Sequence, residues 1–550
     1  MTSSPHPPAR PARATLATLA LLAAIVVLGG VLRLERLGAA HSLNQDEALS
    51  AYDAYSIWKT GRDSWGAPHP LVFREYGAFT NQLQVYLTVP AVALLGLDER
   101  SARLPWALLG SLTPLVAFLL GRELAGPSAG LISALLVAIS PWAIFVSRFA
   151  MPSNLVYVFT GAGVASLTIG LRRPAMLIAS AACFLLAVHT YSSALLFVPL
   201  FLAGAAALHH RELARSGLAT AAGAGLLALG TLPVVWVHLS DPATNWVLAH
   251  FAAYTRDGRP SVLAVLANFA SYFRPDALFD ADGRIAAYAY AENGFLPVAI
   301  VPLLGVGLAL SLARARHDRR YLLLLWWIVA SAASLSLTRS PSTRRFNIAI
   351  PAFEVLAGVG GAFLARALFA SRGAARVAAA AILGTSALWI GVSTASFHAY
   401  LRDELPIEAN RAPYFGFGWK QAIEFAEAHP EYDRVCGTAE TSTSSQPYVY
   451  VLFYTRYDPA TFQRQRAGKQ IVKQGGWTTA DAVGPRYVFR YLELCDRARN
   501  PLYVLNPTER PELRTIRAIA DESGYAPLRL AERARPAASE GGRSQNERGS

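Results

Sequence analysis

The chain has 550 residues, of which 53% are hydrophobic and only 16% are charged, with a mean hydropathy of +0.30. Its apolar residues come in runs of about 20, the length that crosses roughly 30 Å of hydrocarbon, so the sequence predicts a polytopic α-helical membrane protein. The net charge of +13 does not indicate nucleic-acid binding, because the arginines lie in short clusters between apolar runs and no basic groove with interleaved aromatics follows.

The N-terminal segment, residues 1–13, is rich in Pro, Ser and Arg and is expected to be disordered in the cytoplasm, held there by Arg10 and Arg13. Residues 14–34 are predicted to form the first transmembrane helix. A cleavable signal peptide competes with this interpretation, but the apolar run is long for one and charged residues follow it directly. The first helix is therefore expected to remain uncleaved.

An acidic pair, Asp46 and Glu47, follows this first helix. Carboxylates at this point lie close to the bilayer surface, where charge is tolerated and an oily substrate can still arrive. The pair is therefore a candidate catalytic site for a lipid-borne substrate. A helix start with a first-turn acid explains the same residues equally well.

The apolar run 83–97 decides the topology, because every later loop changes side if it spans. If it does not span, the richer arginine set is cytoplasmic: Arg122, Arg172, Arg173, Arg211, Arg215, Arg314, Arg316, Arg319, Arg320, Arg366, Arg372 and Arg376. The short outer loops then keep Arg148, Arg339, Arg344 and Arg345. We therefore expect a re-entrant or interfacial element here, broken at Pro90.

Ten further spans are predicted, which makes about 11 in all: 104–121, 127–147, 151–170, 174–190, 193–208, 217–237, 294–313, 321–338, 347–368 and 375–395. An odd number places the two ends of the chain on opposite sides of the membrane. The transmembrane domain is thus expected over 14–395, with outer loops at 37–103 and 239–293.

The tail mixes helical stretches, such as Trp419 to His429, with strand-like runs at 434–437 and 502–505. It predicts a small extracytoplasmic α/β domain over 396–534, followed by a disordered tail over 535–550. Of the three cysteines, Cys183 is expected in the core, while Cys436 and Cys495 would lie where disulfides are permitted. The sequence gives no argument that brings these two together, and three cysteines are too few for a zinc cage.

Several segments together resemble glycosyltransferase family 39, the group that includes bacterial relatives of protein O-mannosyltransferases and the lipid A aminoarabinose transferase. They are Asp46-Glu47-Ala48, Gly96 to Pro105 leading into Leu109-Gly110 and Leu120 to Arg122, Ser140-Pro141, Ser147-Arg148, Arg344 to Phe346, Ile350-Pro351 and Leu356 to Gly358. The similarity is clearest over residues 30–180 and thins out in the tail. No single motif is specific, and the resemblance rests on order and spacing.

The resemblance implies a GT-C glycosyltransferase in the bacterial inner membrane, with a cytoplasmic N-terminus. Such enzymes move a sugar, with inversion, from a polyprenyl-phosphate carrier to an acceptor hydroxyl on a glycan, lipid or protein at the outer face. Asp46 matches the catalytic carboxylate, and a base at this point suits the chemistry because an alcohol is a poor nucleophile. Glu47 is expected to share that work, orient the acceptor or pair with a basic group.

Fixed cations on the same face are expected to stabilise the departing lipid phosphate, and Arg148, Arg344 and Arg345 are the candidates. Headgroup binding at a helix end is the ordinary alternative for each. Arg103 is expected to anchor the helix that follows it. His189, Tyr191 and Glu292 are candidates for lining the cavity, beside aromatic-belt and capping explanations.

No cofactor and no obligatory metal are expected, because no second acidic motif stands out. Two other function classes stay open: a sugar or lipid-carrier transporter, and a non-catalytic membrane scaffold. A transporter is expected to show mid-bilayer charges in two repeated halves, and the sequence has neither. The sequence does not name the sugar, the carrier, the acceptor or the oligomeric state.

Overall fold

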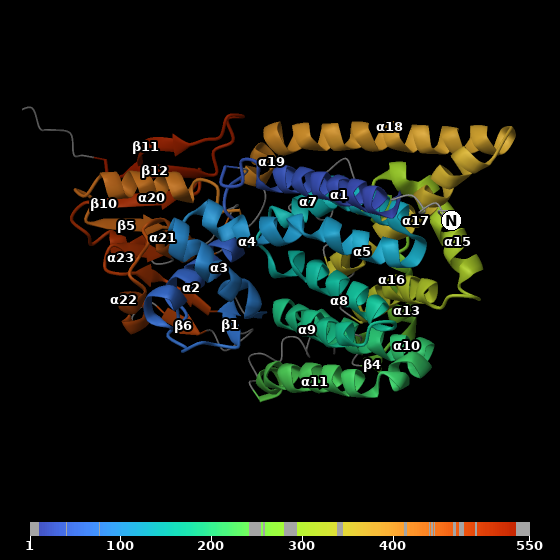
Figure 1. The fold of residues 1–550 in the computed structure, drawn as a ribbon. Helices are drawn as coiled ribbons and strands as arrows, with labels where there is room; N and C mark the ends of the chain where they lie inside the picture. Colours follow the sequence, from blue (N-terminus) through green and yellow to red (C-terminus); the bar gives the residue numbers. More distant parts are fainter. Residues whose placement is uncertain are drawn as a thin grey trace, which may run out of the picture.

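The computed structural model describes the chain over residues 10–39, 41–75, 78–240, 255–256, 259–279, 294–337, 345–411, 415–438, 441, 444, 446–465, 469–471, 478–489 and 492–534. It has two parts that lie end to end: a bundle of apolar helices, and a mixed helix and sheet unit at one end of the bundle (Figure 1). The predicted tail 535–550 lies outside the described residues.

Every predicted span coincides with a helix or a pair of helices. They are α1 (Arg10–Leu34), α4 (Glu99–Ser111) with α5 (Thr113–Ala125), α6 (Pro127–Ile139) with α7 (Pro141–Ser147), η1 (Pro152–Asn154) with α8 (Val156–Gly170), α9 (Ala175–Thr190), α10 (Ala194–Arg215), α11 (Gly217–Ser240), η4 (Val298–Ile300) with α15 (Val301–Arg314), α16 (Arg320–Ser336), η5 (Arg345–Ala349) with α17 (Ile350–Ala370), and α18 (Ala374–Asp403).

Within the described residues, seven helices are long and apolar enough to cross a membrane, and α6 with α7 makes up to eight if that bent pair is one span. The other predicted spans, α9, α15 and α16, have 16, 14 and 17 residues. At 1.5 Å per residue these helices are shorter than about 30 Å, so length alone does not establish the count of 11. The fold class is confirmed, and the count stays a prediction.

Two predicted boundaries, the start of the first span and the end of the last, differ from the helix boundaries in the structure. Helix α1 begins at Arg10, within the segment expected to be disordered, and α18 runs to Asp403, beyond the predicted end at residue 395. Both extensions carry charged residues that hydropathy excludes from a span but that a helix projecting from the bilayer accommodates.

The bend between α6 and α7 is 59° and follows from Ser140 and Pro141. Proline has no N–H to donate, so carbonyls one turn earlier lose their helical partners. The Arg33 guanidinium replaces them, donating to the carbonyls of Val137 at 3.0 Å and Ala138 at 2.9 Å. A buried arginine of α1 thus satisfies a broken helix inside the bundle.

The outer loop folds into α2 (Gln45–Thr60), a hairpin of β1 (Val72–Glu75) and β2 (Ala78–Asn81), and α3 (Leu83–Leu95). Helix α3 packs on α2 and on α4, and its expected non-spanning position stays a prediction. It remains one helix through Pro90, so the expected break is wrong.

The tail forms a six-stranded sheet in the order β11-β12-β10-β5-β9-β8, in which β5 is parallel to both β10 and β9. Its elements are β5 (Arg434–Gly437), β8 (Ala482–Val483), β9 (Tyr487–Phe489), β10 (Pro501–Leu505), β11 (Arg514–Ile519), β12 (Leu528–Glu532) and helices α19 (Leu405–Arg411), α20 (Trp419–Ala428), α21 (Pro447–Tyr454), α22 (Pro459–Arg464) and α23 (Leu492–Cys495). Cys436 and Cys495 form a disulfide between β5 and α23.

Smaller elements are β3 (Thr255–Arg256), β4 (Arg259–Pro260), α13 (Val262–Ser271), α14 (Pro275–Phe279), β6 (Lys469–Ile471) and β7 (Thr478–Ala480).

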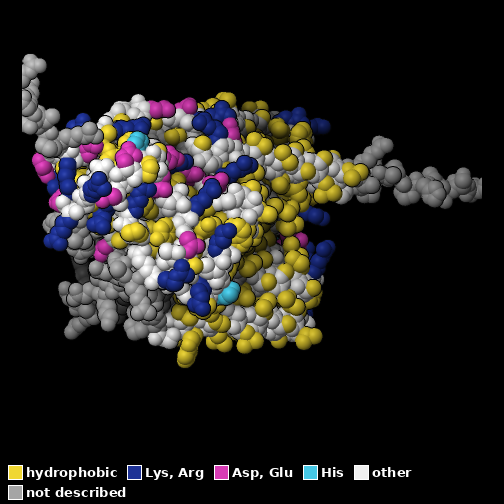
Figure 2. Space-filling view, turned by 90° about the vertical axis from the view of Figure 1, so that its left-hand side faces the viewer, with side chains coloured by type: hydrophobic (Ala, Val, Ile, Leu, Met, Phe, Trp, Pro, Cys, Tyr) yellow, Lys and Arg dark blue, Asp and Glu magenta, His cyan; other side chains and the backbone are white. Residues whose placement is uncertain are grey.

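The outer loop and the tail share one hydrophobic core, which the sequence does not predict. Leu49 and Tyr52 of α2 are buried together with Tyr448 and Leu452 of α21, and the Tyr52 hydroxyl donates to the Tyr457 carbonyl at 2.9 Å. Figure 2, viewed from this end, shows acidic and basic side chains interspersed over the surface and hydrophobic side chains gathered on its right-hand flank. The two segments therefore form one extramembrane unit.

Candidate active site

The start of α2 is fixed by a buried ion pair between Glu47 and Arg103 of α4, neither of which has exposed side-chain surface. Arg103 donates to both carboxylate oxygens, Nε to Oε1 at 2.9 Å and Nη2 to Oε2 at 2.9 Å. The backbone N–H of Ala150 donates to Oε1 at 2.9 Å and that of Asn44 to Oε2 at 3.0 Å. Because four donor atoms bind this one buried carboxylate, Glu47 is a structural anchor. Of the three roles expected for Glu47, the structure shows the one in which it pairs with a basic group.

Arg103 also holds the segment that leaves α1, since its guanidinium donates to the carbonyls of Leu37, His41 and Ser42 at 3.3 Å. One ion pair therefore joins the end of α1, the start of α2, α4 and the turn after α7. This arrangement agrees with the expected anchoring role of Arg103 and extends it to the whole neighbourhood of the acidic pair.

Asp46 lies at the N-terminus of α2 and is partly exposed, in contrast to its buried neighbour Glu47. Asn44 caps the helix: its side-chain oxygen accepts from the Asp46 N–H at 2.9 Å. The capping box explains why the helix starts here, and the anchor at Glu47 fixes the direction in which residue 46 points. The structure thus accounts for Glu47 as a first-turn acid of α2, and a catalytic role for Asp46 stays a prediction.

The tail supplies neighbours of the acidic pair that the sequence does not point to. Burial raises the pKa of the Tyr450 phenol well above its usual range, and the charges of Asp46 and Glu47 add to the effect, which places this α21 tyrosine beside the pair. Tyr450 occupies the space that a Cβ on Gly416 would need, and Gly416 has φ of 59°. A glycine is required there, so the approach of Tyr450 depends on residue 416.

His41 lies beside Arg103 in the same region, with its Nδ1 3.1 Å from the Arg103 Nη2. Its ring lies edge-on to Phe149 and Phe415, with centroids 5.7 and 5.3 Å away. Burial and the adjacent Arg103 lower the pKa of His41 to about 3, so the ring is neutral at physiological pH. Nothing in the local sequence marks His41, because its aromatic partners come from distant segments.

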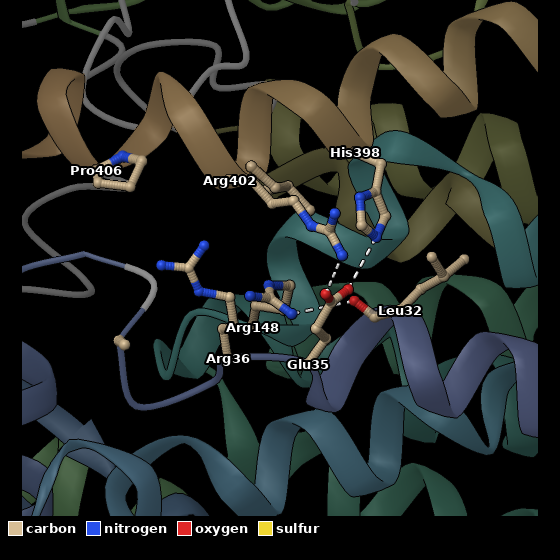
Figure 3. A pocket seen from close by; sticks show the side chains of 9 residues that line it. Leu32, Glu35, Arg36, Arg148, His398, Arg402 and Pro406 are labelled. Atoms are coloured by element: carbon tan, nitrogen blue, oxygen red, sulfur yellow. Dashed lines mark hydrogen bonds and ion pairs between the residues drawn. The ribbon is translucent and has the colours of Figure 1, made fainter.

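Arg148 follows α7 and points to the side of the bundle formed by α1 and α18. Its Nη1 donates to the carbonyls of Leu32 at 3.1 Å and Arg33 at 3.2 Å, and the side chain lines a pocket that also holds Glu35 and Arg402 (Figure 3). Burial is the main cause that lowers the pKa of Arg148 to about 10, so it remains a cation at neutral pH.

Arg345 begins η5, which packs against α8, α16 and η1, and it forms a hydrogen bond with Tyr191, the C-cap residue of α9. Helix α9 is far from α1 and α18 across the bundle (Figure 1). The structure thus brings together Arg345 and Tyr191, which the sequence suggests for separate roles. It does not place Arg148 with them. Arg344 and Glu292 lie outside the described residues.

His189 ties the outer hairpin to the bundle. Its Nδ1 lies 2.6 Å from the Gln82 amide nitrogen and its Nε2 3.0 Å from the Gly230 carbonyl. Beside it, the Asn81 amide donates to the Val188 carbonyl at 2.6 Å. Both ring nitrogens are engaged, which favours a positioning role for His189 over a direct contact with a substrate.

No group of three or more His, Cys, Asp or Glu side chains suited to a metal ion occurs among the described residues. Near the start of α2, Asp46 is partly exposed and Glu47 is buried in its ion pair with Arg103.

Comparison with known proteins identifies the group to which this chain is similar. Residues 84–237 match the family model described as dolichyl-phosphate-mannose-protein mannosyltransferase. No curated protein matches the chain by sequence. The family match confirms the predicted resemblance to glycosyltransferase family 39 and, with it, the enzyme class.

Two solved structures of one protein have a fold similar to that of this chain. ArnT from Cupriavidus metallidurans bound to undecaprenyl phosphate has a TM-score of 0.58 at 17% identity, covering 94% of this chain and 97% of ArnT. The apo state of the same protein also gives 0.58, at 16% identity, over 94% of this chain and 98% of that one. The Archaeoglobus fulgidus oligosaccharyltransferase in its apo form gives 0.49 at 15% identity, over 79% and 63%. The predicted GT-C architecture is confirmed by the ArnT match.

Proposed function

We propose that this membrane glycosyltransferase moves a sugar from a polyprenyl-phosphate carrier to an acceptor hydroxyl at the outer face of the membrane. The observation that carries the proposal is the position of Asp46. It is a partly exposed carboxylate whose helix start is locked by the buried Glu47 and Arg103 pair, at the boundary between the apolar bundle and the extramembrane unit.

Asp46 acts as the general base. It takes the proton of the acceptor hydroxyl while the acceptor oxygen forms a bond to the anomeric carbon and the bond from that carbon to the phosphate oxygen breaks. Direct displacement inverts the anomeric centre, and a positioned base contributes about 10²–10⁴-fold. Glu47 is not a second base, because four donors already occupy its oxygens.

The departing polyprenyl phosphate gains charge as the bond breaks, and a nearby guanidinium stabilises it. We assign this role to Arg345, held by Tyr191, together with its neighbour Arg344. Arg148 is left out of the donor site, because its guanidinium contacts α1 and faces α18. A GT-C structure solved with undecaprenyl phosphate supports a donor of this chemical class.

The acceptor, a glycan, lipid or protein, is selected by the extramembrane unit and the 239–293 loop, because binding specificity resides in loops over a rigid scaffold. The disulfide between Cys436 and Cys495 supports an extracytoplasmic location for this unit, and hence a cytoplasmic N-terminus in a bacterial inner membrane. We propose neither a cofactor nor an obligatory metal.

The proposal is tested with the full-length protein reconstituted in lipid, given a panel of radiolabelled polyprenyl-phosphate sugars and the envelope fraction of a strain that lacks the protein. Asp46→Asn is expected to abolish transfer to that fraction, while Glu522→Gln, a change of an exposed carboxylate in the tail, leaves it intact. Transfer that persists undiminished in Asp46→Asn rules out Asp46 as the base, whereas no transfer by the parent protein with any donor of the panel favours a scaffold. Sugar crossing the bilayer without transfer identifies a transporter.

A further inference from the structure

Two arginines fix the short helix α7 to the end of α1, and each donates hydrogen bonds to the segment of the other. Arg33 of α1 donates from Nη1 to the Ala138 carbonyl at 2.9 Å, near the end of α6, and from Nε to the Ser147 hydroxyl at 3.1 Å, at the end of α7. Arg148, the residue after α7, donates from Nη1 to the carbonyls of Leu32 at 3.1 Å and Arg33 at 3.2 Å (Figure 3). These reciprocal contacts of Arg33 and Arg148 are here named the arginine clamp.

The backbone acceptors of the arginine clamp are carbonyls in the last turns of α1 and α6, where a helix cannot satisfy its own carbonyls. Those turns also carry the negative end of the helix dipole, which favours a cation. Both arginines are buried, with 0% of Arg33 and 6% of Arg148 exposed. Because a buried guanidinium is stable only when its donors are bound, the clamp holds α7 in one position relative to α1.

The turn that follows α7 connects the arginine clamp to the acidic pair. In this turn the Ala150 N–H donates to Glu47 Oε1 at 2.9 Å. The ring of Phe149 lies edge-on to that of His41, which belongs to the segment leading into α2, with centroids 5.7 Å apart. A shift of α7 therefore moves a hydrogen-bond donor of Glu47, and with it the first turn of α2, which carries Asp46.

Arg148 is also an arginine that the sequence suggests for the departing lipid phosphate. A phosphate is bound most strongly by guanidinium N–H groups that face it together as a fork. In this structure the Arg148 Nη1 is bound to two backbone carbonyls and its Nε is enclosed by the surrounding protein. These are the contacts of a residue that holds the backbone in place.

We propose that Arg148 is a positioning residue for Asp46. Together with Arg33 it fixes α7, and the turn after α7 then fixes the start of α2 through Ala150 and Glu47. Arg148 touches neither donor nor acceptor in this role. The inference rests on the proposed function, in which Asp46 is the general base.

The first test measures initial rates of the full-length protein in lipid over a series of donor concentrations. Arg148→Gln is expected to lower kcat about tenfold to hundredfold and to change the donor KM less than about twofold, because a displaced base slows the chemical step and leaves donor binding intact. Arg148→Lys is expected to restore part of kcat, since an ammonium group reaches one of the two carbonyls. The matched control, Arg402→Gln, removes a neighbouring guanidinium that is bound to Glu35 and is expected to keep both constants within about twofold.

Combination with Asp46→Asn tests whether Arg148 acts through Asp46. Arg148→Gln is expected to cause little further loss of transfer in the Asp46→Asn protein, because the base that it positions is already absent. A residue that contacts the donor phosphate would instead cause a loss that multiplies with the loss at Asp46. Multiplying losses, or a raised donor KM with unchanged kcat in Arg148→Gln, overturn the proposal.

A readout that does not depend on transfer separates this inference from the proposed function. Hydrogen–deuterium exchange of residues 45–50, at the start of α2, is expected to be at least about tenfold faster in Arg148→Gln than in the parent, while β12 exchanges equally in both. Arg148→Lys gives a smaller increase and serves if Arg148→Gln does not fold. Unchanged exchange at the start of α2 overturns the proposal, whereas faster exchange in a protein whose parent transfers no sugar contradicts the proposed function alone.

Discussion

Arg103 and Glu47 form a doubly hydrogen-bonded ion pair with no exposed side-chain surface, 56 residues apart in the sequence. The pair joins four segments of the chain at the place where the helix bundle meets the extramembrane unit. Its position explains why the acidic dipeptide contains one anchor and one accessible carboxylate. The stability of this region and the chemistry at Asp46 are therefore separable by mutation.

Glu47→Gln is expected to destabilise the protein by about 3–5 kcal/mol, because it leaves the Arg103 charge buried without its partner. Thermal unfolding of the purified protein measures the effect. The double variant Glu47→Gln/Arg103→Gln is expected to lose less than the sum of the single variants, since removing both charges removes the unpaired one. Strictly additive losses contradict the coupling.

Asp46→Asn is expected to lower the rate of sugar transfer by about 10²–10⁴-fold while leaving the unfolding temperature within a degree or two of the parent. The amide keeps the size of the side chain and loses its basicity. Initial rates over a series of acceptor concentrations separate loss of the base from loss of acceptor binding, because loss of a base lowers kcat more than it raises KM. A raised KM with unchanged kcat assigns Asp46 to binding instead.

Arg345→Gln is expected to weaken use of the lipid-phosphate donor about tenfold to hundredfold in kcat/KM, because the leaving phosphate loses its cation. Arg345→Lys restores part of the activity, and Tyr191→Phe loses less than Arg345→Gln because it removes only the hydrogen bond that orients the guanidinium. The order of the three variants in donor titrations is the readout. If all three variants keep the activity of the parent protein, Arg345 is not part of the donor site.

Reduction of the bond between Cys436 and Cys495 is expected to destabilise the extramembrane unit by about 2–4 kcal/mol, because the bond closes a loop across 59 residues. Cys436→Ser/Cys495→Ser should reproduce the loss and make the protein insensitive to reductant. In intact cells, an impermeant thiol reagent is expected to label a cysteine introduced at the exposed position 522 by Glu522→Cys, because Cys436 and Cys495 are themselves buried. Labelling only after cell lysis places the unit in the cytosol.

Burial beside Asp63 raises the pKa of Asp53 in α2 to about 8, from an ordinary value of 3.8. The folded state therefore favours the protonated form, so this group's contribution to stability is complete below about pH 4 and is lost as the pH rises toward 8. Asp53→Asn, which is always neutral, is expected to gain about 1–2 kcal/mol of stability at pH 8 relative to the parent and none at pH 4. Parallel unfolding curves across this range contradict the assignment.

Prediction from the sequence is accurate where the physics is local. The apolar runs correspond to helices because about 20 apolar residues have one stable arrangement in a bilayer. The strand at 434–437 and the helix from Trp419 are likewise set by short-range periodicity. The break expected at Pro90 is wrong, because neighbouring packing retains the helix.

In the candidate site too, the sequence shows the local features and the structure alone shows those that depend on distant partners. The acidic pair is visible in the sequence, but its two members look alike there. Only Arg103 and the Ala150 N–H, brought in from other segments, identify Glu47 as the anchor. Tyr450, His41 and the Cys436–Cys495 bond have no local signal, since each depends on a partner far along the chain.

By itself, the sequence determined the membrane class, the helical segments and the acidic pair after the first crossing, because hydropathy and helix propensity act over short stretches. The tertiary structure alone decided that the outer loop and the tail share one core, that Glu47 is an anchor, and that Arg148 contacts the end of α1 while Arg345 contacts Tyr191. These outcomes depend on burial and on pairing between distant residues, which set the energy of a charge and are fixed only when the chain has folded.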